Sequence, residues 1–344
     1  MARKSKRKVL KAVALILAVV AVAWGVIALI PRPDNYEGDN PMLKDGELPI
    51  LIAHGGGNKE FPDNTLEAFY NAYLVDERVM METDVSITKD GVLILSHDTS
   101  LDRKTNVTGN IIDWNYSDLI TQRVDFGYTN PTKDGVLSGE RVHFKGPDGE
   151  EKYPADIDPD GKLGRDSEVF LATTLEDLLL TFPNNRINVE IKQEGETGLL
   201  AFEEALRLLE KYDAYDRVVL ASFHDELYDE YLRRKDAGEV PAEFMCSPGI
   251  GGVIKYYVLY LVGLDIFFSD KMCVFQLPTE EYGFDLSTKG IVNRAHAHNL
   301  AVHYWTINDP DEMRELIEIG ADGIMTDYPH RLKEVYESYK TGEN

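Results

Sequence analysis

The chain has 344 residues, of which 43% are hydrophobic and 28% charged, which suits one large globular domain or two small ones. Six of its 36 basic side chains lie in residues 1–11, so the rest of the chain carries 30 basic against 60 acidic side chains, a net charge of −30. A body this acidic excludes nucleic acid as a partner, because phosphate binding needs a basic face.

The N-terminus joins this basic segment, residues 1–11, to a long apolar run. Residues 12–30 contain no charged side chain, and a helix of these 19 residues would be about 28 Å long, close to the thickness of a bilayer core. Because basic residues stay on the cytoplasmic side, the sequence predicts a single-pass anchor in the cell membrane, with the rest of the chain outside the cytoplasm. A cleaved signal peptide is the alternative, but the run is longer than a usual signal core and lacks a clear cleavage site.

Residues 31–48, rich in Pro, Gly and Asp, are expected to be a polar linker, and short apolar runs alternate with amphipathic stretches over residues 49–338. The predicted strands are residues 50–54, 79–87, 187–191, 218–223, 243–246, 272–276, 301–307 and 323–326. The clearest predicted helices are residues 64–74, 199–211, 286–297 and 310–319. Eight strand–helix units predict an α/β fold, a (β/α)8 TIM-like barrel. An open doubly wound sheet is the alternative, because periodicity does not show closure.

Two segments depart from this alternation. The turn at residues 89–91, Lys-Asp-Gly, predicts that residues 92–98 return as a β-hairpin. Residues 113–173 form an insertion too long for a plain loop, which we expect to cover part of the barrel. Its acidic stretch at residues 156–166 resembles a calcium loop only incompletely, because Ser167 replaces the last ligand, and a solvated loop is favoured. Cys246 and Cys273 fall in neighbouring predicted strands, where a disulfide and two core thiols both remain open.

Acidic residues recur at strand spacing in two of the predicted strands. Glu82 and Asp84 lie two residues apart, which places both on one face, and Glu190 shares a face with Asn188 and Lys192 in the same way. Three acids directed into a barrel would be costly to bury without partners. A divalent cation removes that cost, and an all-oxygen ligand set without cysteine suits Ca²⁺ or Mg²⁺ rather than zinc.

Two histidines end strands next to these acids. His54 ends the first strand and His97 ends the return strand of the hairpin. Beside a hard cation, two histidines can supply a general base and a general acid near neutral pH. The remaining histidines are expected to be structural: His143, His224, His296, His298, His303 and His330.

Several stretches resemble the glycerophosphodiester phosphodiesterase family, in order and in spacing: "IAHGGG", "PDNTLEAF", "METDVSITKDGVLILSHDTSLDRKTN", "TLEDLL", "NVEIK" and "YWTINDPDEMRELIEIGADGIMTDYP". They cover most of residues 50–330, with the insertion and residues 226–282 matching least. The resemblance implies a TIM-like barrel with a small inserted subdomain. It also implies a metal held by three acids and an acid–base pair of two histidines, namely Glu82, Asp84, Glu190, His54 and His97.

The resemblance further implies that Lys192 and Trp305 line the substrate pocket. It fails at one position, because the family usually has His-Arg-Gly where this chain has His54 followed by Gly55 and Gly56. The family arginine would neutralise phosphate charge. One interpretation is that the N–H groups of the glycines form an anion-binding nest for the substrate, with Lys59 adding charge. The other is a tight turn that uses glycine for close packing.

These observations predict an outward-facing, membrane-anchored enzyme that hydrolyses glycerophosphodiesters to an alcohol and glycerol phosphate with a divalent cation, Ca²⁺ or Mg²⁺. The attacking hydroxyl is either water or a neighbouring hydroxyl of the glycerol, which would give a cyclic phosphate. The alternatives are a lysophospholipid-cleaving, phospholipase D-like barrel, a noncatalytic binder of phosphoglycerol polymers and a metal-stabilised structural barrel. The presence of all three acids and both histidines argues against a noncatalytic role.

Overall fold

A computed structural model of the protein describes residues 2–130 and 140–342. Eight parallel strands run in the order β8-β7-β6-β2-β1-β13-β12-β9. Their bounds are β1 (Ile50–His54), β2 (Met80–Ile87), β6 (Ile187–Ile191), β7 (Val218–Ala221), β8 (Met245–Cys246), β9 (Val274–Leu277), β12 (Ala301–Tyr304) and β13 (Gly323–Thr326). At the last seam, the N–H of Cys273 donates a hydrogen bond of 3.2 Å to the C=O of Cys246. The strands therefore form a nearly closed barrel, which confirms the predicted TIM fold over the open sheet.

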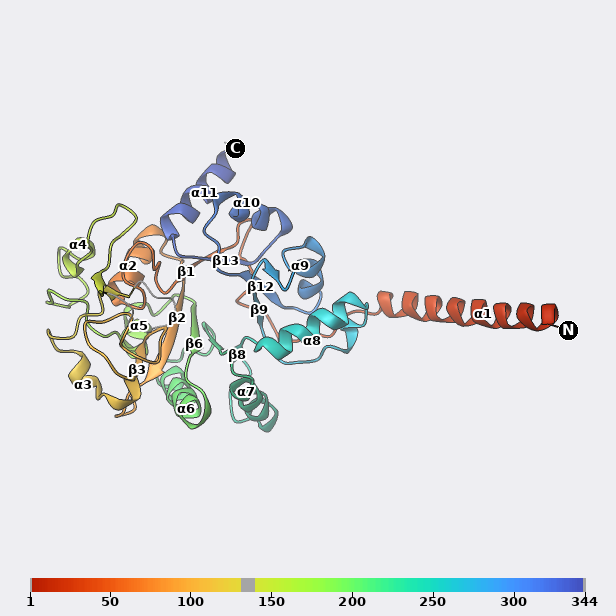
Figure 1. Cartoon of the computed structure of the whole chain (residues 1–344), viewed down its shortest axis with the longest axis horizontal. Helices are drawn as coiled ribbons and strands as arrows, with labels where there is room; N and C mark the ends of the chain where they lie inside the picture. Colours follow the sequence, from red (N-terminus) through yellow and green to blue (C-terminus); the bar gives the residue numbers. More distant parts are fainter. Residues whose placement is uncertain (1, 131–139, 343–344) are drawn as a thin grey trace.

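Helices surround the barrel on its outer side (Figure 1). They are α2 (Leu66–Val75), α5 (Leu175–Thr181), α6 (Gly195–Lys211), α7 (Asp225–Ala237), α8 (Ile250–Leu261), α9 (Lys289–His296), α10 (Pro310–Ile319) and α11 (Pro329–Thr341), with a short turn η2 (Asp265–Phe267) after α8. Alternate residues of β1 belong to different cores: Leu51 and Ala53 pack with the helices, whereas Ile50 and Ile52 pack inside the barrel. This period-two alternation directs every second side chain of a strand to the barrel interior.

The predicted hairpin is confirmed, because β3 (Leu93–Leu95) pairs antiparallel with β2. The insertion that follows contains η1 (Ile111–Asp113), α3 (Tyr116–Leu119), β4 (Tyr128–Thr129), β5 (Val142–His143) and α4 (Pro154–Ile157), and its residues 131–139 lie outside the described residues. Its own apolar cluster packs against Phe61 and Ala68, near the start of α2. Backbone N–H groups of the insertion also bond to the C=O groups of Arg103 and Lys104. The insertion thus supports the loop that follows β3. That the insertion also covers part of the barrel remains a prediction.

The segment expected to be a polar linker is partly built into the barrel. Tyr36 and Met42 are buried in the same apolar cluster as Ile50 and Ile52. The C=O of Met42 accepts a hydrogen bond from the ring of His303, 2.8 Å away, and His303 is fully buried as a structural residue. The linker prediction was therefore wrong for this part, because the barrel interior needs apolar side chains to fill the end at which its strands begin.

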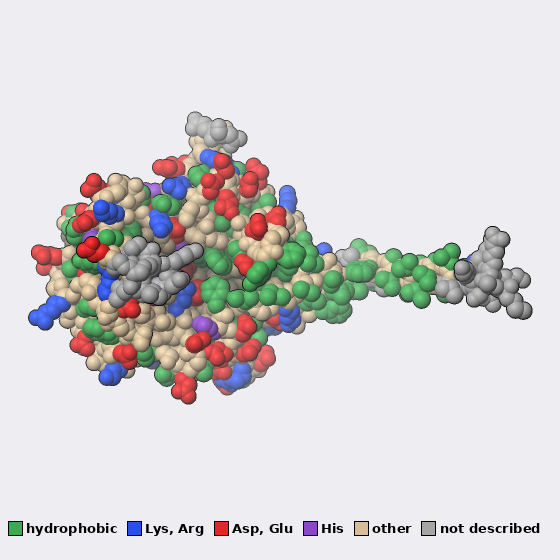
Figure 2. All heavy atoms as spheres, viewed as in Figure 1, with side chains coloured by type: hydrophobic (Ala, Val, Ile, Leu, Met, Phe, Trp, Pro, Cys, Tyr) green, Lys and Arg blue, Asp and Glu red, His purple; other side chains and the backbone are tan. Residues whose placement is uncertain are grey.

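A single helix, α1 (Ala2–Leu29), projects from the body, and its described surface is almost entirely apolar (Figures 1 and 2). Its stretch Leu10–Ile27 is long and apolar enough to cross a membrane, a property that an N-terminal signal sequence shares. The chain's two cysteines are both free and buried, so the structure resolves the open question about Cys246 and Cys273 in favour of two core thiols. Two short strands, β10 (Glu280–Glu281) and β11 (Phe284–Asp285), form a hairpin before α9.

Candidate active site

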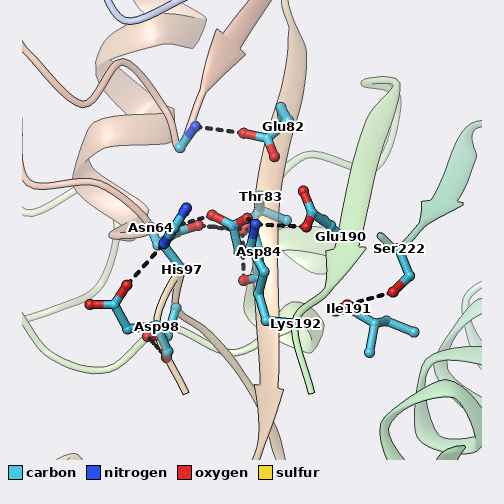
Figure 3. Close-up of polar contacts among 12 residues, drawn as sticks. Asn64, Glu82, Thr83, Asp84, His97, Asp98, Glu190, Ile191, Lys192 and Ser222 are labelled. Atoms are coloured by element: carbon cyan, nitrogen blue, oxygen red, sulfur yellow. Dashed lines mark hydrogen bonds and ion pairs between the residues drawn. The ribbon is translucent and has the colours of Figure 1, made fainter. Parts of the chain in front are cut away.

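Three carboxylates from two neighbouring strands converge inside the barrel. Asp84 of β2 pairs with Glu190 of β6, and Glu82 lies two residues earlier on the same face of β2. Glu82 and Asp84 are buried, and one oxygen of each of the three acids lies within 4.8 Å of the others. In the part of the chain that the structure describes, no other group of three or more acidic, histidine or cysteine side chains is arranged to hold a metal ion. The structure thus brings together the three predicted ligands (Figure 3).

Negative charge in this cluster exceeds the nearby positive charge. The ammonium nitrogen of Lys192 lies 3.0 Å from Asp84 and 2.7 Å from Glu190. Burial, reinforced by the charge of Asp84, still raises the pKa of Glu82 to about 7, and burial also raises the pKa of Glu190. A divalent cation would favour the charged form of every acid in the cluster, and buried carboxylate oxygens are ligands that Ca²⁺ and Mg²⁺ accept. The residues present therefore fit such an ion.

Asn64 connects the loop after β1 to this cluster. Its side-chain amide donates to Asp84 over 3.1 Å, and its carbonyl oxygen accepts hydrogen bonds from the hydroxyl of Thr83 and from the N–H of Asp84. The sequence predicted only the start of a helix at this point, and the residue that caps this helix is Thr65, whose side chain accepts from the N–H of Ala68. Asn64 is therefore a site residue that the sequence analysis missed, although it lies in one of the stretches that resemble the family.

His54 is paired with an aspartate from the neighbouring strand. Its Nδ1 lies 2.6 Å from Asp327, which directly follows β13, and its Nε2 lies 3.9 Å from Glu82. Burial alone would lower the pKa of His54, but the hydrogen bond with Asp327 and the charges of Glu82 and Asp84 outweigh burial and raise this pKa to about 9. The Nδ1–H therefore donates to Asp327, and Nε2 lies on the side of the carboxylate cluster. Asp327 was not identified from the sequence as a site residue.

His97 has the same kind of partner in a more open position. Its Nδ1 lies 2.9 Å from the carboxylate of Asp98, and this hydrogen bond raises the pKa of His97. Arg103 in turn holds Asp98 with two hydrogen bonds of 2.7 Å. The ring is about half exposed, whereas that of His54 is mostly enclosed. Both predicted histidines thus have one ring nitrogen fixed by a carboxylate, and the other remains available for proton transfer.

The glycines after β1 form a tight turn. Their φ angles are +56° at Gly55, +85° at Gly56 and +98° at Gly57, a region that favours glycine. All four backbone N–H groups from Gly55 to Asn58 donate within the protein. Gly55 donates to Glu82 over 2.9 Å, and the next three donate to the C=O groups of Ala53 or His54. No N–H in the turn is thus free to meet a phosphate in this structure, and substrate binding by Gly55 and Gly56 stays a prediction.

Close packing gives the second reason for glycine here. A Cβ at Gly55 would lie 2.9 Å from the Cβ of Asp63, and one at Gly56 would lie 2.9 Å from the Cβ of Ala68 in α2. The carboxylate of Asp63 holds Lys104, so any side chain at Gly55 would disturb this ion pair. The turn interpretation is the one that the geometry supports, and it lets α2 approach the end of β1 closely.

Aromatic residues flank the cluster next to Lys192. Trp305, which follows β12, is half-buried, and its ring centroid lies 6.0 Å from that of Phe223. The ammonium nitrogen of Lys192 is 5.7 Å from the centre of the Phe223 ring, which is 48% exposed. The two residues predicted to line the substrate pocket, Lys192 and Trp305, therefore share Phe223 as a neighbour. The sequence analysis missed Phe223, which follows β7 and carries no motif of its own.

Comparison with known proteins places this geometry in context. The model of the "Glycerophosphoryl diester phosphodiesterase family" matches residues 54–331. A glycerophosphodiester phosphodiesterase of Bacillus altitudinis is 24% identical over 294 residues, which cover 84% of this chain and 99% of the relative. The human lysophospholipase D GDPD1 is 25% identical over 309 residues, which cover 84% of this chain and 86% of the relative.

Solved structures show the same fold. A glycerophosphodiester phosphodiesterase from Agrobacterium tumefaciens aligns with a TM-score of 0.57 at 17% identity, and the alignment covers 83% of this chain and all of that one. A phosphodiesterase from Oleispira antarctica, in complex with the product sn-glycerol-3-phosphate, aligns with a TM-score of 0.58 at 20% identity over 85% of this chain and 98% of that one.

Proposed function

The chain belongs to the glycerophosphoryl diester phosphodiesterase family of enzymes, and we propose that it hydrolyses glycerophosphodiesters to an alcohol and glycerol phosphate at the outer face of a membrane. One observation carries the assignment of the site: three carboxylates on β2 and β6 converge beside a histidine that an aspartate orients. Buried acids gathered in this way, next to a proton-transfer group, are typical of metal-assisted hydrolysis.

Glu82, Asp84 and Glu190 would hold a divalent cation, Ca²⁺ or Mg²⁺. When bound, such an ion polarises the phosphoryl oxygens and lowers the pKa of a coordinated hydroxyl. The chain's own residues keep the three acids in place: the N–H of Gly55 donates to Glu82, and the side chain of Asn64 donates to Asp84. The acids therefore have fixed positions before any ligand arrives, which reduces the reorganisation needed for binding.

His54 and His97 form the proposed acid–base pair. A proton held on Nε2 of one imidazole would pass to the leaving alcohol, while the other imidazole would take a proton from the attacking hydroxyl. Asp327 and Asp98 each fix Nδ1 of their histidine, so that Nε2 is the nitrogen that exchanges the proton. The attacking hydroxyl is that of water or of the glycerol itself, and the second route yields a cyclic phosphate.

The proposed substrate class follows from the family, and two features of the chain bear on which substrate it would cleave. The chain has Gly55 where the family usually has arginine, so a phosphate would have to find its positive charge elsewhere. Lys192 and Arg103 are the basic side chains next to the acids and histidines. Lysophospholipids are the second candidate substrate, favoured by the relatives named lysophospholipase D and by an apolar N-terminal helix that would keep the site near lipid.

The proposed location rests on α1. Its apolar stretch would span the membrane once, with the basic residues 1–11 in the cytoplasm and the barrel outside. Protease added to intact cells should then digest the barrel. Digestion only after permeabilisation would show that the orientation is reversed, and a mature protein that begins after residue 30 would show that α1 is a signal sequence.

The activity can be tested with the full chain in detergent micelles. Glycerophosphocholine, lysophosphatidylcholine and polyglycerolphosphate are incubated with the enzyme in Ca²⁺, Mg²⁺ or EDTA, with Glu190→Gln as the matched inactive variant. We expect release of alcohol from glycerophosphocholine with a divalent cation and none in EDTA. Cleavage of lysophosphatidylcholine alone would favour the second candidate. Polymer binding without cleavage of any substrate would favour a noncatalytic binder.

A further inference from the structure

The outer face of α8 carries a row of exposed aliphatic side chains, here called the α8 stripe. It consists of Ile250, Ile254, Val258 and Leu261, which are 54%, 53%, 53% and 58% exposed. Their spacing of four, four and three residues places them on one face of the helix. Val262 and Phe267, also exposed, extend the apolar surface beyond the end of the helix. An exposed apolar row of this length is unusual on a soluble surface and marks a contact site.

The opposite face of α8 fixes the helix to the barrel. Tyr256 is buried, and its ring packs against Phe268 and Phe275 with centroid distances of 5.2 and 4.5 Å. The helix contains no acidic residue, although the chain has 60, and its single charged residue, Lys255, forms an ion pair with Asp270. The stripe is therefore the outer surface of a firmly packed helix whose single charged side chain is paired with Asp270.

The stripe adjoins the proposed membrane anchor. The indole of Trp24 in α1 lies against Gly263, two residues after the end of α8, where a Cβ would be 2.8 Å from the indole nitrogen. A few residues further on, the guanidinium of Arg32 forms a buried ion pair of 2.8 Å with Asp265 in η2. The end of α1 is thus held at the end of α8, and Figure 2 shows apolar side chains that continue from α1 onto the body.

We propose that the α8 stripe contacts the surface of the phospholipid bilayer that α1 enters, so that the barrel rests on the membrane instead of hanging from a free tether. A bilayer is the occupant that the geometry favours, because the contact between Trp24 and Gly263 brings lipid to the end of the stripe whenever α1 spans the membrane. Tyrosines suit the headgroup region, and Tyr257 and Tyr260 flank the stripe. The proposal rests on the membrane anchor, but not on the phosphodiesterase activity.

This contact would also orient the active site. α8 begins four residues after β8, at the end of the barrel where the strands finish, and it ends beside the anchor. A stripe seated on lipid would therefore hold the catalytic end of the barrel at a fixed height above the bilayer.

The test uses the full chain in nanodiscs of phosphatidylcholine and phosphatidylglycerol. Because both native cysteines are buried, a new exposed cysteine takes a fluorophore selectively. The reporters are Ile254→Cys on the stripe, Leu200→Cys on α6 as a control of similar exposure, 57%, and Leu17→Cys on α1 as the anchor control. Lipids with nitroxide-labelled acyl chains should quench positions 17 and 254 and leave position 200 unchanged. Adding Val258→Asp should abolish the quenching at 254 and retain that at 17.

The other outcomes distinguish contact between the α8 stripe and lipid from insertion of α1 into the membrane. Quenching at position 17 without quenching at 254 would refute the docking and leave the anchor intact. Absence of quenching at both would refute both. If position 254 is shielded from aqueous iodide but not quenched by the labelled lipid, another copy of the chain covers the stripe and the bilayer proposal is wrong. Quenching at 254 that survives Val258→Asp would show that the stripe does not carry the contact.

Discussion

Gly56→Ala tests whether close packing, and not only backbone conformation, requires glycine in the turn that ends β1. An alanine at Gly56 would have to adopt a φ of +85°, which costs about 1–2 kcal/mol for a residue with a Cβ. Its Cβ would also lie 2.9 Å from the Cβ of Ala68 and 2.9 Å from the backbone nitrogen of Phe69. Both belong to α2, and overpacking of this kind costs roughly 1–3 kcal/mol. The free energy of unfolding should therefore fall by about 2–5 kcal/mol.

A matched control separates the two contributions. Gly91, in the β2–β3 hairpin, has nearly the same φ of +83°, but nothing lies within 4 Å of the position of its Cβ. Gly91→Ala should therefore lower the free energy of unfolding only by the conformational contribution, about 1–2 kcal/mol. Both variants also gain the same stabilisation from a less flexible unfolded chain, so this gain does not affect their difference. Urea denaturation of the detergent-solubilised chain, followed by intrinsic fluorescence, measures the difference, which should be about 1–3 kcal/mol. Equal destabilisation by the two substitutions would refute the packing argument.

Three further predictions concern the acids and their partners. Glu82→Gln should abolish both tight binding of a divalent cation, measured by calorimetry, and turnover of glycerophosphocholine; retained cation affinity would contradict the proposed ligand set. Asp327→Asn should lower the pKa of His54, measured by NMR, from about 9 toward its ordinary value near 6.5. In the parent protein the folded-state pKa of His54 is raised, so the stabilisation by charged His54 is complete below the unfolded pKa and is lost as the pH rises through about 9. Compared with the parent, the variant should therefore lose stability below about pH 6.5 and lose little above about pH 9. Arg32→Ala should lower the free energy of unfolding by about 3 kcal/mol, because it leaves the buried charge of Asp265 with weaker partners; an unchanged urea midpoint would show that this ion pair does not hold the anchor to the barrel.

Local patterns predicted most of the barrel. β1 has the predicted bounds, because an apolar run followed by three glycines leaves little freedom in where the strand ends. Glu82 and Asp84 share a face because side chains on a strand alternate, whatever the rest of the fold does. The hairpin at Gly91 and the helix capped by Thr65 also follow from short-range rules. Each of these features depends on a few neighbouring residues, which the sequence displays directly.

The parts that the sequence did not reveal depend on closure of the barrel. Asp327 lies 273 residues from His54 and becomes its partner only because β13 pairs with β1. Composition suggested a solvent-exposed linker before β1, but Tyr36 and Met42 fill the interior that eight closed strands create. Phe223 carries no motif and acquires a place at the site from the position of β7 alone. Such contacts are set by the register and order of strands, which hydrophobic periodicity does not encode.

Gly55, which follows His54, also joins the end of β1 to the carboxylate cluster through hydrogen bonds. The N–H of Gly55 donates to Glu82, and its C=O accepts from the N–H of Asn64, 2.9 Å away. Asn64 in turn donates from its side chain to Asp84. A short chain of hydrogen bonds therefore runs from the end of β1 to two of the three acids, and it uses only the backbone of Gly55. Because these bonds need no side chain at position 55, a glycine there leaves intact the hydrogen bonds that join the end of β1 to the carboxylates.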